Sequence, residues 1–308
     1  MKSKNFSLYL GLVLVMFLWG LTFVFFKIAF ESFKPISIVM MRLIISVIFI
    51  YLAAKLLKKL QKVKKEDYKY LLLMAFFEPF LYFLGESFGL QYVSSTLASV
   101  MIATIPLVVP IAAYFIFSER LSRLNIFGLL VSTLGVIAVV LAVDAEWAAT
   151  LKGILLMFLA VLAASAYTLL AKKLSSSYNG FTITIWQNFF GLFMFLPIFL
   201  IWDLKDLMNT VPTTNSIYAV LYLAIFGSSV TFIIFTRAVR ELGAAKANIF
   251  ANLIPVFTAI ASFLLLKEEM PILKILGIAI VLIGLILSQL KSIKRKSKRE
   301  TIPENIAI

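Results

Sequence analysis

The sequence predicts an all-α integral membrane protein, in which ten transmembrane helices form two inverted five-helix repeats. Apolar runs of spanning length, alternating basic segments and an internal repeat carry this prediction. Hydrophobic residues make up 62% of the chain and charged residues 14%, whereas a soluble domain is about 45–50% apolar and about 25% charged. With a mean hydropathy of +1.02, the chain needs lipid as its solvent.

Ten apolar runs are long enough to cross a bilayer, because a helix rises ~1.5 Å per residue and the hydrocarbon layer is ~30 Å thick. Short polar or proline-bearing connections separate them. The first run is too long for the core of a signal peptide, so we count it as a span. The predicted spans are 8–29, 36–56, 70–91, 94–117, 124–142, 151–172, 181–202, 216–238, 244–266 and 272–290.

The basic residues indicate how these spans are oriented. With the N-terminus in the cytoplasm, 22 of the 29 Lys and Arg residues fall in inner segments and five in outer segments, while Lys27 and Arg42 lie within spans. This positive-inside pattern requires an even number of spans, so we expect both termini to be cytoplasmic. The net charge of +14 then reflects orientation, and we expect no nucleic-acid partner. The inner segments are 1–7, 55–69, 118–123, 172–180, 237–246 and 291–308.

An internal repeat defines the domain organisation. Residues 90–139 align with 239–288 at a constant offset of 149, without a gap. Because each repeat holds five spans, an odd number, the second copy must enter the membrane upside down, as in many secondary transporters. We therefore expect a first repeat (1–142), a second, inverted repeat (143–290) and a basic cytoplasmic tail (291–308). The matching residues include Pro106 and Pro255, Glu119 and Glu268, Gly128 and Gly277, and Gly135 and Gly284.

Two sequence patterns point to a known family. Each repeat closes with Ala, Pro, Glu and two Gly at matching positions, and the first repeat opens with Trp19-Gly20-x-x-Phe23-x-x-x-Lys27, Pro35 and Arg42. This combination resembles the EamA branch of the drug/metabolite transporter superfamily over roughly residues 8–290. The resemblance implies a ten-helix basket with both termini inside, a central cavity between the halves, and transport of metabolites, often outward.

The second repeat departs from the opening pattern of that family. Ala164 stands where Trp is expected, and Gln187 stands where Arg42 would map, whereas Tyr167 and Lys172 fit. The two halves are therefore expected to share a scaffold and to differ in the polar groups that they offer to a substrate.

Ionisable side chains within a span are costly unless they are paired or hydrated, so each is a candidate functional group. Glu78 and Glu86 lie on the third span, and Lys27 and Arg42 lie toward the outer ends of the first two. We expect Lys27 and Arg42 to neutralise Glu86 in a charge cluster that serves structure, substrate binding or gating. Glu78 has no basic residue at its own depth, which predicts proton coupling, a cationic substrate or a neutral structural acid.

Polar and aromatic residues at comparable depth complete the predicted substrate site. Asn248 and Asn252 are four residues apart and share a helix face, although such asparagines can also simply join helices. An aromatic pocket with a few polar groups suits amino acids, nucleobases or related amphiphiles. The predicted substrate-binding residues are Trp19, Thr22, Glu78, Tyr82, Glu86, Tyr167, Gln187, Asn248 and Asn252.

Proline and glycine mark candidate hinges and close helix contacts. Proline removes a hydrogen bond from the helix, which can create a hinge, expose a carbonyl to a cavity or simply kink the helix for packing. The predicted hinges are Pro79, Pro106 and Pro255. Glycines seven residues apart share a face, and we expect packing either between the last helices of the two repeats or at a dimer contact. These glycines are Gly128, Gly135, Gly277 and Gly284.

These features predict a secondary transporter, and specifically an exporter of small organic metabolites that works by alternating access in the inner (cytoplasmic) membrane. The alternative is a channel, a scramblase or another non-carrier membrane protein. The chain has no His or Cys and no phosphate-binding loop, so we expect no enzyme activity, metal or cofactor. The expected partners are a small-molecule substrate, the lipid bilayer and, where transport is coupled, protons, with the protein acting as a monomer or homodimer.

Overall fold

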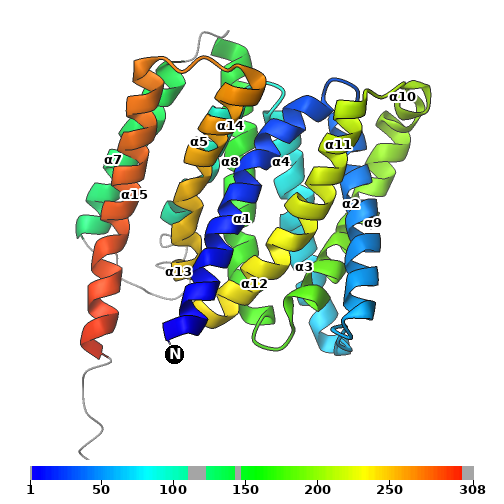
Figure 1. The fold of residues 1–308 in the computed structure, drawn as a ribbon, viewed down its shortest axis with the longest axis horizontal. Coiled ribbons are helices and arrows are strands. Elements are labelled where there is room, and N and C mark those ends of the chain that lie inside the picture. The colour runs from blue at the N-terminus through cyan, green and yellow to red at the C-terminus, as the bar shows by residue number, and fades with distance from the viewer. Residues whose placement is uncertain (1, 110–122, 143–146, 300–308) are drawn as a thin grey trace, which may run out of the picture.

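The computed structural model describes residues 2–109, 123–142 and 147–299, and this part of the chain is helical with no strand (Figure 1). Six of the described helical segments are long and apolar enough to cross a membrane. Large apolar side chains such as Leu10, Leu134 and Ile201 are exposed on the surface, as lipid contact requires. The chain is a multi-pass membrane protein. Shorter apolar helices lie at Ser95–Val109, Ile126–Val139, Phe250–Leu266 and Ile272–Gly284.

Helices in the first half begin and end close to the limits of the predicted spans. Pro35 begins its helix at a position where the missing N–H costs nothing. Ser94 caps another helix by accepting a hydrogen bond from the Leu97 N–H at 3.2 Å. The elements are α1 (Lys2–Ala29), α2 (Pro35–Leu56), η1 (Lys65–Asp67), α3 (Tyr68–Ala75), η2 (Phe76–Leu81), α4 (Tyr82–Gly89), α5 (Ser95–Ile102) and α7 (Arg123–Leu141).

Helices in the second half follow the same rules of local structure. Asn179 and Thr213 cap two of them through their side-chain oxygens, and Gly243, with φ +87°, allows the turn between two others. The elements are α8 (Trp147–Leu174), α9 (Gly180–Trp202), α10 (Leu204–Asn209), α11 (Thr214–Tyr222), η3 (Leu223–Val230), α12 (Thr231–Leu242), α13 (Ala244–Ile249), η4 (Phe250–Leu253), α14 (Ile254–Ala261), η5 (Ser262–Leu266) and α15 (Ile272–Arg299).

The three predicted hinge prolines all lie at breaks in the helices. Helix α5 ends at Ile102, a turn follows, and Pro106 lies at the start of the next helical stretch. Pro255 lies in the first turn of α14, directly after the 3₁₀ turn η4. The π-helical turn η2 contains Glu78 in a non-helical conformation (φ −144°, ψ 117°), followed by Pro79. The breaks are confirmed, whereas a hinge motion at these prolines stays a prediction.

The predicted connection at 203–215 is not a simple loop, because it contains the short helix α10. Asp203 is the first residue of this segment, and its side chain is buried. Its carboxylate accepts hydrogen bonds from the Ser37 N–H (3.0 Å) and the Ser37 hydroxyl (3.3 Å). Leu204 and Leu207 pack against the core of the molecule. Buried side chains therefore order a segment whose composition predicts only a polar connection.

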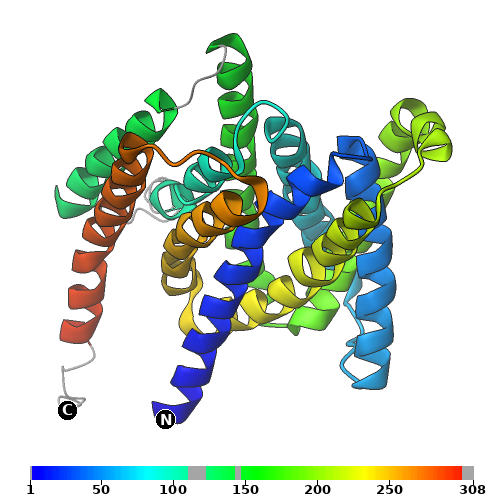
Figure 2. The same cartoon turned by 45° about the horizontal axis from the view of Figure 1, so that its top comes forward.

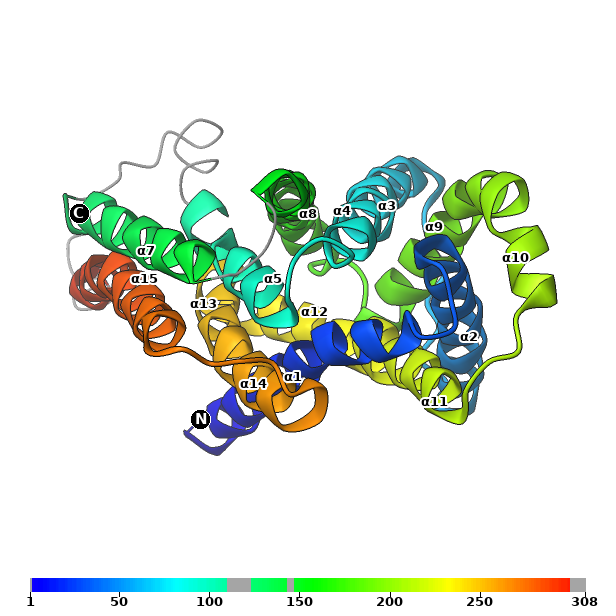
Figure 3. The same cartoon turned by 90° about the horizontal axis from the view of Figure 1, so that it is seen from above.

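The helices α7 and α15 lie side by side at one end of the molecule, away from α2, α9 and α10 at the other end (Figures 1 and 3). Helix α1 runs between the two ends and packs against α11, α12 and α14. The beginning of α1 and the end of α15 lie on the same side of the molecule (Figures 1 and 2). We refer to this side as the N-terminal side and to the opposite side as the distal side.

Glycine allows close contact between α7 and α15. A Cβ atom added to Gly135 would lie 2.6 Å from the Val281 N and 2.8 Å from the Gly277 O, both on α15. A Cβ atom added to Gly277 would lie 3.0 Å from the Gly135 O. This confirms that the glycine pairs pack these two helices against each other, since any larger residue must push the backbones apart.

We expect Gly135→Ala to destabilise the folded protein by roughly 1–3 kcal/mol, because the new methyl group collides with the backbone of α15. Gly11→Ala is the matched control, since its Cβ atom would meet only the Ile234 Cγ2 at 3.3 Å. The measurement is the melting temperature of each variant purified in detergent. Equal melting temperatures for the two variants would contradict the proposed steric cause.

A cross-connection on the distal side joins the two halves of the chain. The Glu268 carboxylate accepts hydrogen bonds from the Ser95 N–H (2.9 Å) and the Thr96 hydroxyl (2.8 Å), at the start of α5. Lys274 of α15 pairs with the same carboxylate at 3.3 Å and is only 5% exposed. The positive end of the α5 dipole favours a carboxylate here. Glu268 thus ties α5 to the segment between η5 and α15.

Candidate functional site

A cavity lies between helices from the two halves of the chain. The first half contributes residues of α1, α2, η2, α4 and α5, and the second half contributes residues of α8, η3, α12, α13, η4 and α14. The cavity and its mouth together hold about 610 Å³ of empty space. Of the predicted site residues, the lining includes Trp19, Thr22, Arg42, Glu78, Tyr82, Glu86, Tyr167 and Asn248.

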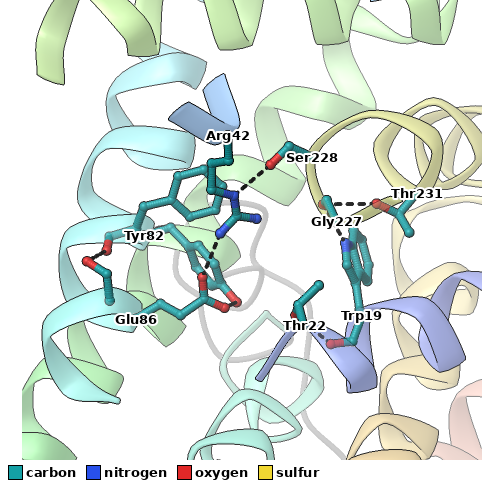
Figure 4. A network of polar contacts seen from close by, with 10 residues as sticks. Trp19, Thr22, Arg42, Tyr82, Glu86, Gly227, Ser228 and Thr231 are labelled. Atoms are coloured by element: carbon teal, nitrogen blue, oxygen red, sulfur yellow. Dashed lines mark hydrogen bonds and ion pairs between the residues drawn. The ribbon is translucent and has the colours of Figure 1, made fainter. Parts of the chain in front are cut away.

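A buried ion pair forms one wall of this cavity (Figure 4). The Arg42 Nη1 lies 3.5 Å from the Glu86 Oε2, and the two side chains are 2% and 3% exposed. The Arg42 Nε donates a hydrogen bond to the Ser228 hydroxyl at 2.9 Å, and the Tyr82 hydroxyl donates to Glu86 Oε1 at 3.0 Å. The guanidinium carbon lies 3.9 Å from the centre of the Phe83 ring. Each partner is therefore held by its charge and by a second polar contact, as a buried pair requires.

Glu78 lies in the same cavity without such a partner. Its side chain is 5% exposed and forms no hydrogen bond or ion pair within the described part of the chain. The break in the helix places it at the centre of η2. There, the following Pro79 packs against Gly191 of α9, at a contact that leaves no room for a Cβ atom. A tightly packed backbone thus carries a free carboxyl group.

Aromatic rings form the wall nearer to the N-terminal side. The Trp19 ring lies 5.3 Å from Phe232 and 5.1 Å from Phe235, and Tyr167 lies 5.8 Å from Phe232. The Trp19 Nε1 donates a hydrogen bond to the Gly227 carbonyl at 3.3 Å, which fixes the orientation of the indole (Figure 4). The arrangement offers apolar surface beside two acidic groups, which is a general feature of small-molecule sites.

A comparison with known families adds the decisive observation. The model of the EamA-like transporter family matches residues 6–141 and, a second time, residues 151–290. The chain belongs to the EamA-like transporter family. The resemblance predicted from the sequence motifs is thereby confirmed, and the family indicates a transporter and not an enzyme.

Relatives of this EamA-like transporter have similar length and carry transporter names. It is 28% identical over 293 residues to the uncharacterized transporter YetK of Bacillus subtilis (strain 168), covering 94% of this chain and 88% of YetK. It is also 28% identical over 313 residues to the uncharacterized transporter YcxC of the same organism, covering 98% of each. An uncharacterized transporter of Archaeoglobus fulgidus is 27% identical over 277 residues, covering 89% of this chain and 95% of that protein.

A solved structure shares the fold of this transporter. A protein described only by the words "Crystal structure of protein" superposes with a TM-score of 0.71 over 94% of this chain and 99% of that chain. The sequence identity is 13%, so the likeness concerns the fold alone.

Three residues of the predicted site do not lie where the sequence places them. Among the described residues, Gln187 and Asn252 are outside the cavity lining. Their side-chain amides are buried without a hydrogen-bond partner. Lys27 interacts electrostatically with Glu268 and not with Glu86, so the charge cluster at Glu86 contains Arg42 alone. Sequence position gives the depth of these residues along a helix but not the direction in which each side chain points.

The sequence reasoning missed the hydroxyl groups that hold the ion pair in place. Ser228 binds Arg42 through its hydroxyl, and its carbonyl accepts hydrogen bonds from the Ser46 hydroxyl (3.2 Å) and the Asn188 Nδ2 (2.9 Å). Ser46 also lies 2.6 Å from the Ser229 hydroxyl. Small polar residues scattered through an apolar helix have no characteristic spacing. The one signal in the sequence was Arg42 itself, because a buried guanidinium group needs polar partners on the neighbouring helices.

We expect Gln187→Met to raise the free energy of unfolding by roughly 1–3 kcal/mol, because it removes a buried amide that lacks partners and keeps the side-chain volume. Asn188→Leu is the matched control on the same helix and should destabilise the protein, since Asn188 donates to Ser46 and Ser228. Melting temperatures in detergent distinguish the two effects. A less stable Gln187→Met protein would show that Gln187 is satisfied by groups such as bound water.

Proposed function

We propose that this transporter is a secondary carrier that exports small organic metabolites, such as amino acids, nucleobases or related amphiphiles, across the cytoplasmic membrane. The observation that carries the proposal is the cavity between the two halves, with a buried ion pair, a free carboxyl group and an aromatic wall. A carrier needs such a site near the middle of the membrane, at the interface of its repeats. Glu78 lines this cavity and has no partner in the described part of the chain, so its carboxyl group is available to a substrate.

Alternating access follows from the proposed arrangement of ten helices in two inverted repeats. The family model matches the chain twice, and breaks at Pro106 and Pro255 recur at the repeat offset of 149. The π-helical turns η2 and η3 overlap at the same offset. In an inverted repeat, exchanging the conformations of the halves closes one side of the cavity and opens the other. Basic residues orient the N-terminal side toward the cytoplasm in this proposal.

The cavity lining favours loading from the cytoplasmic side. Thr168, Phe235 and Asn248 line the cavity and lie about one to two helical turns from the ends of α8, α12 and α13 on the N-terminal side. On the distal side, the first residues of α5, including Ser95 and Ser99, are fully buried. Entry from the cytoplasm and release outside, which is the cycle of an exporter, matches this arrangement.

The test is a panel of amino acids, nucleobases and organic amines assayed for counterflow in proteoliposomes that contain the full-length protein. We expect at least one solute to exchange with saturation, and to be accelerated by the same solute on the opposite side. Linear flux without saturation would indicate a channel instead. Absence of any solute-dependent flux in liposomes with correctly folded protein would refute the carrier proposal.

A further inference from the structure

Among the described residues, the cavity of this transporter is lined by one basic and two acidic side chains, besides its tyrosines. Arg42 can carry one positive charge, whereas Glu78 and Glu86 can carry two negative charges. Arg42 and Glu86 neutralise each other, which leaves Glu78 unpaired. We infer that the cargo is an organic cation, an amine or quaternary ammonium compound with an apolar body, which binds at Glu78 in exchange for a proton. The inference rests on the proposed transport function and narrows its substrate class.

The positive charge of Arg42 is already matched by Glu86 within the protein. Its Nε is used by Ser228, its Nη1 faces Glu86, and the face of its guanidinium lies over Phe83. An anion that took the place of Glu86 would have to break this ion pair. That exchange would leave a second buried carboxylate without a partner, which is strongly unfavourable where water is excluded. The ion pair therefore selects against acids and shapes the wall of the cavity.

Glu78 offers what a cation requires. It is almost fully buried, lines the cavity and has no partner in the described part of the chain. Attraction between opposite charges is stronger at such a site than in water. The rings of Trp19, Tyr167 and Phe232 line the same cavity. They form a wall that suits both the ammonium group and the apolar body of an organic cation.

The proposed exchange balances both protons and charge. In the empty cavity, Glu78 carries a proton, because an unpaired carboxylate is costly in a site from which water is largely excluded. When a monocation binds, the carboxyl group releases that proton to the solvent, so the charge of the site stays the same. The reverse exchange on the other side of the membrane completes an electroneutral cycle of one proton for one monocation. Among the described residues, the ionisable groups that interact electrostatically with Glu78 are Glu86, Arg42, Tyr82 and Tyr167.

The binding test uses the full-length protein in detergent and benzyltrimethylammonium, a cation that cannot itself titrate. Calorimetric titrations in two buffers with different ionisation enthalpies count the released protons. We expect one proton per bound cation, and an affinity that falls about tenfold for each pH unit below the range in which Glu78 ionises. Phenylacetate, an anion of similar size, should not bind. Cation binding without proton release, or preferential binding of phenylacetate, would overturn the inference.

Variants of Glu78 separate its charge from its contribution to folding. Glu78→Gln should weaken cation binding at least about tenfold and abolish proton release, since it removes the charge and preserves the shape. Glu78→Asp should retain proton release, because it keeps the carboxyl group. Glu66→Gln is the matched control, as Glu66 is an exposed acid of η1 outside the cavity. Unchanged affinity in a folded Glu78→Gln protein would contradict the assignment.

Transport measurements distinguish failure of this inference from failure of the proposed function. Saturable counterflow of neutral or anionic solutes that persists in Glu78→Gln would overturn the cation site and leave the carrier proposal standing. Cation binding with proton release, but without counterflow in proteoliposomes, would support the site and refute the carrier proposal. With both intact, benzyltrimethylammonium flux should follow a pH gradient and should not respond to membrane potential.

Discussion

Replacing Arg42 by methionine is expected to lower the free energy of unfolding by roughly 3–5 kcal/mol, because Glu86 would remain in a buried site without its partner. The double variant Arg42→Met/Glu86→Gln should recover most of this loss, since it removes both charges together. The measurement is the melting temperature of each full-length variant in detergent. The burial of both side chains, at 2% and 3% exposure, is what makes the expected effect large.

An exposed ion pair of the same protein provides the matched control for Arg42. Lys34 and Asp206 form a salt bridge with side chains that are 57% and 48% exposed. Lys34→Met should therefore change the stability little, because exposed pairs are hydrated in either state. Equal destabilisation by Lys34→Met and Arg42→Met, or no recovery in the double variant, would show that the Arg42–Glu86 pair does not act as described.

The second large effect is expected at Glu268, the residue that ties α5 to the second half of the chain. Glu268→Gln weakens two hydrogen bonds and leaves the buried Lys274 without its carboxylate. We expect a loss of roughly 3 kcal/mol in stability. We also expect the distal side to open, because the start of α5 is released from the segment that covers it.

Opening at Glu268 can be measured directly, because the chain contains no cysteine. A single Ala98→Cys substitution places a thiol at a fully buried position of α5. Labelling by a membrane-impermeant maleimide in proteoliposomes should be at least about tenfold faster with Glu268→Gln, the factor that corresponds to roughly 1.4 kcal/mol. Glu269→Gln is the matched control, since Glu269 is exposed and only its backbone carbonyl binds Lys274. Equal labelling rates in both variants would contradict a closing role for Glu268.

Span positions could be predicted from the sequence because the bilayer imposes them. A helix must be apolar over a fixed length, and helices such as α2 and α9 end where that length ends. The breaks near Pro106 and Pro255 were also predictable, since proline cannot donate to the helix. The internal course of η3 was not, because no proline or charged residue marks that turn.

The candidate site was predictable in depth but not in direction. Arg42 and Glu86 were placed together correctly because both lie at a similar height in the membrane. Lys27 has a similar height, yet it interacts with Glu268 because the rotation of α1 points it there. Gln187 lies outside the cavity lining for the same reason. Rotation about a helix axis depends on packing among all neighbours, which a single sequence does not reveal.

The π-helical turns η2 and η3 are held open by different means. In η2, the ring of Pro79 removes a backbone donor permanently. In η3 and at the start of α12, side-chain hydroxyl groups bind the backbone carbonyls. The Ser229 hydroxyl donates to the Ala224 carbonyl (2.8 Å), and the Thr231 hydroxyl donates to the Phe226 carbonyl (2.7 Å). A hydroxyl group can release the carbonyl that it binds, so that the carbonyl can accept a backbone hydrogen bond again. A proline has no backbone N–H, so the hydrogen bond missing at Pro79 cannot form. Only the second of these segments can therefore straighten into a regular helix, so the two similar halves do not have equal freedom to change length.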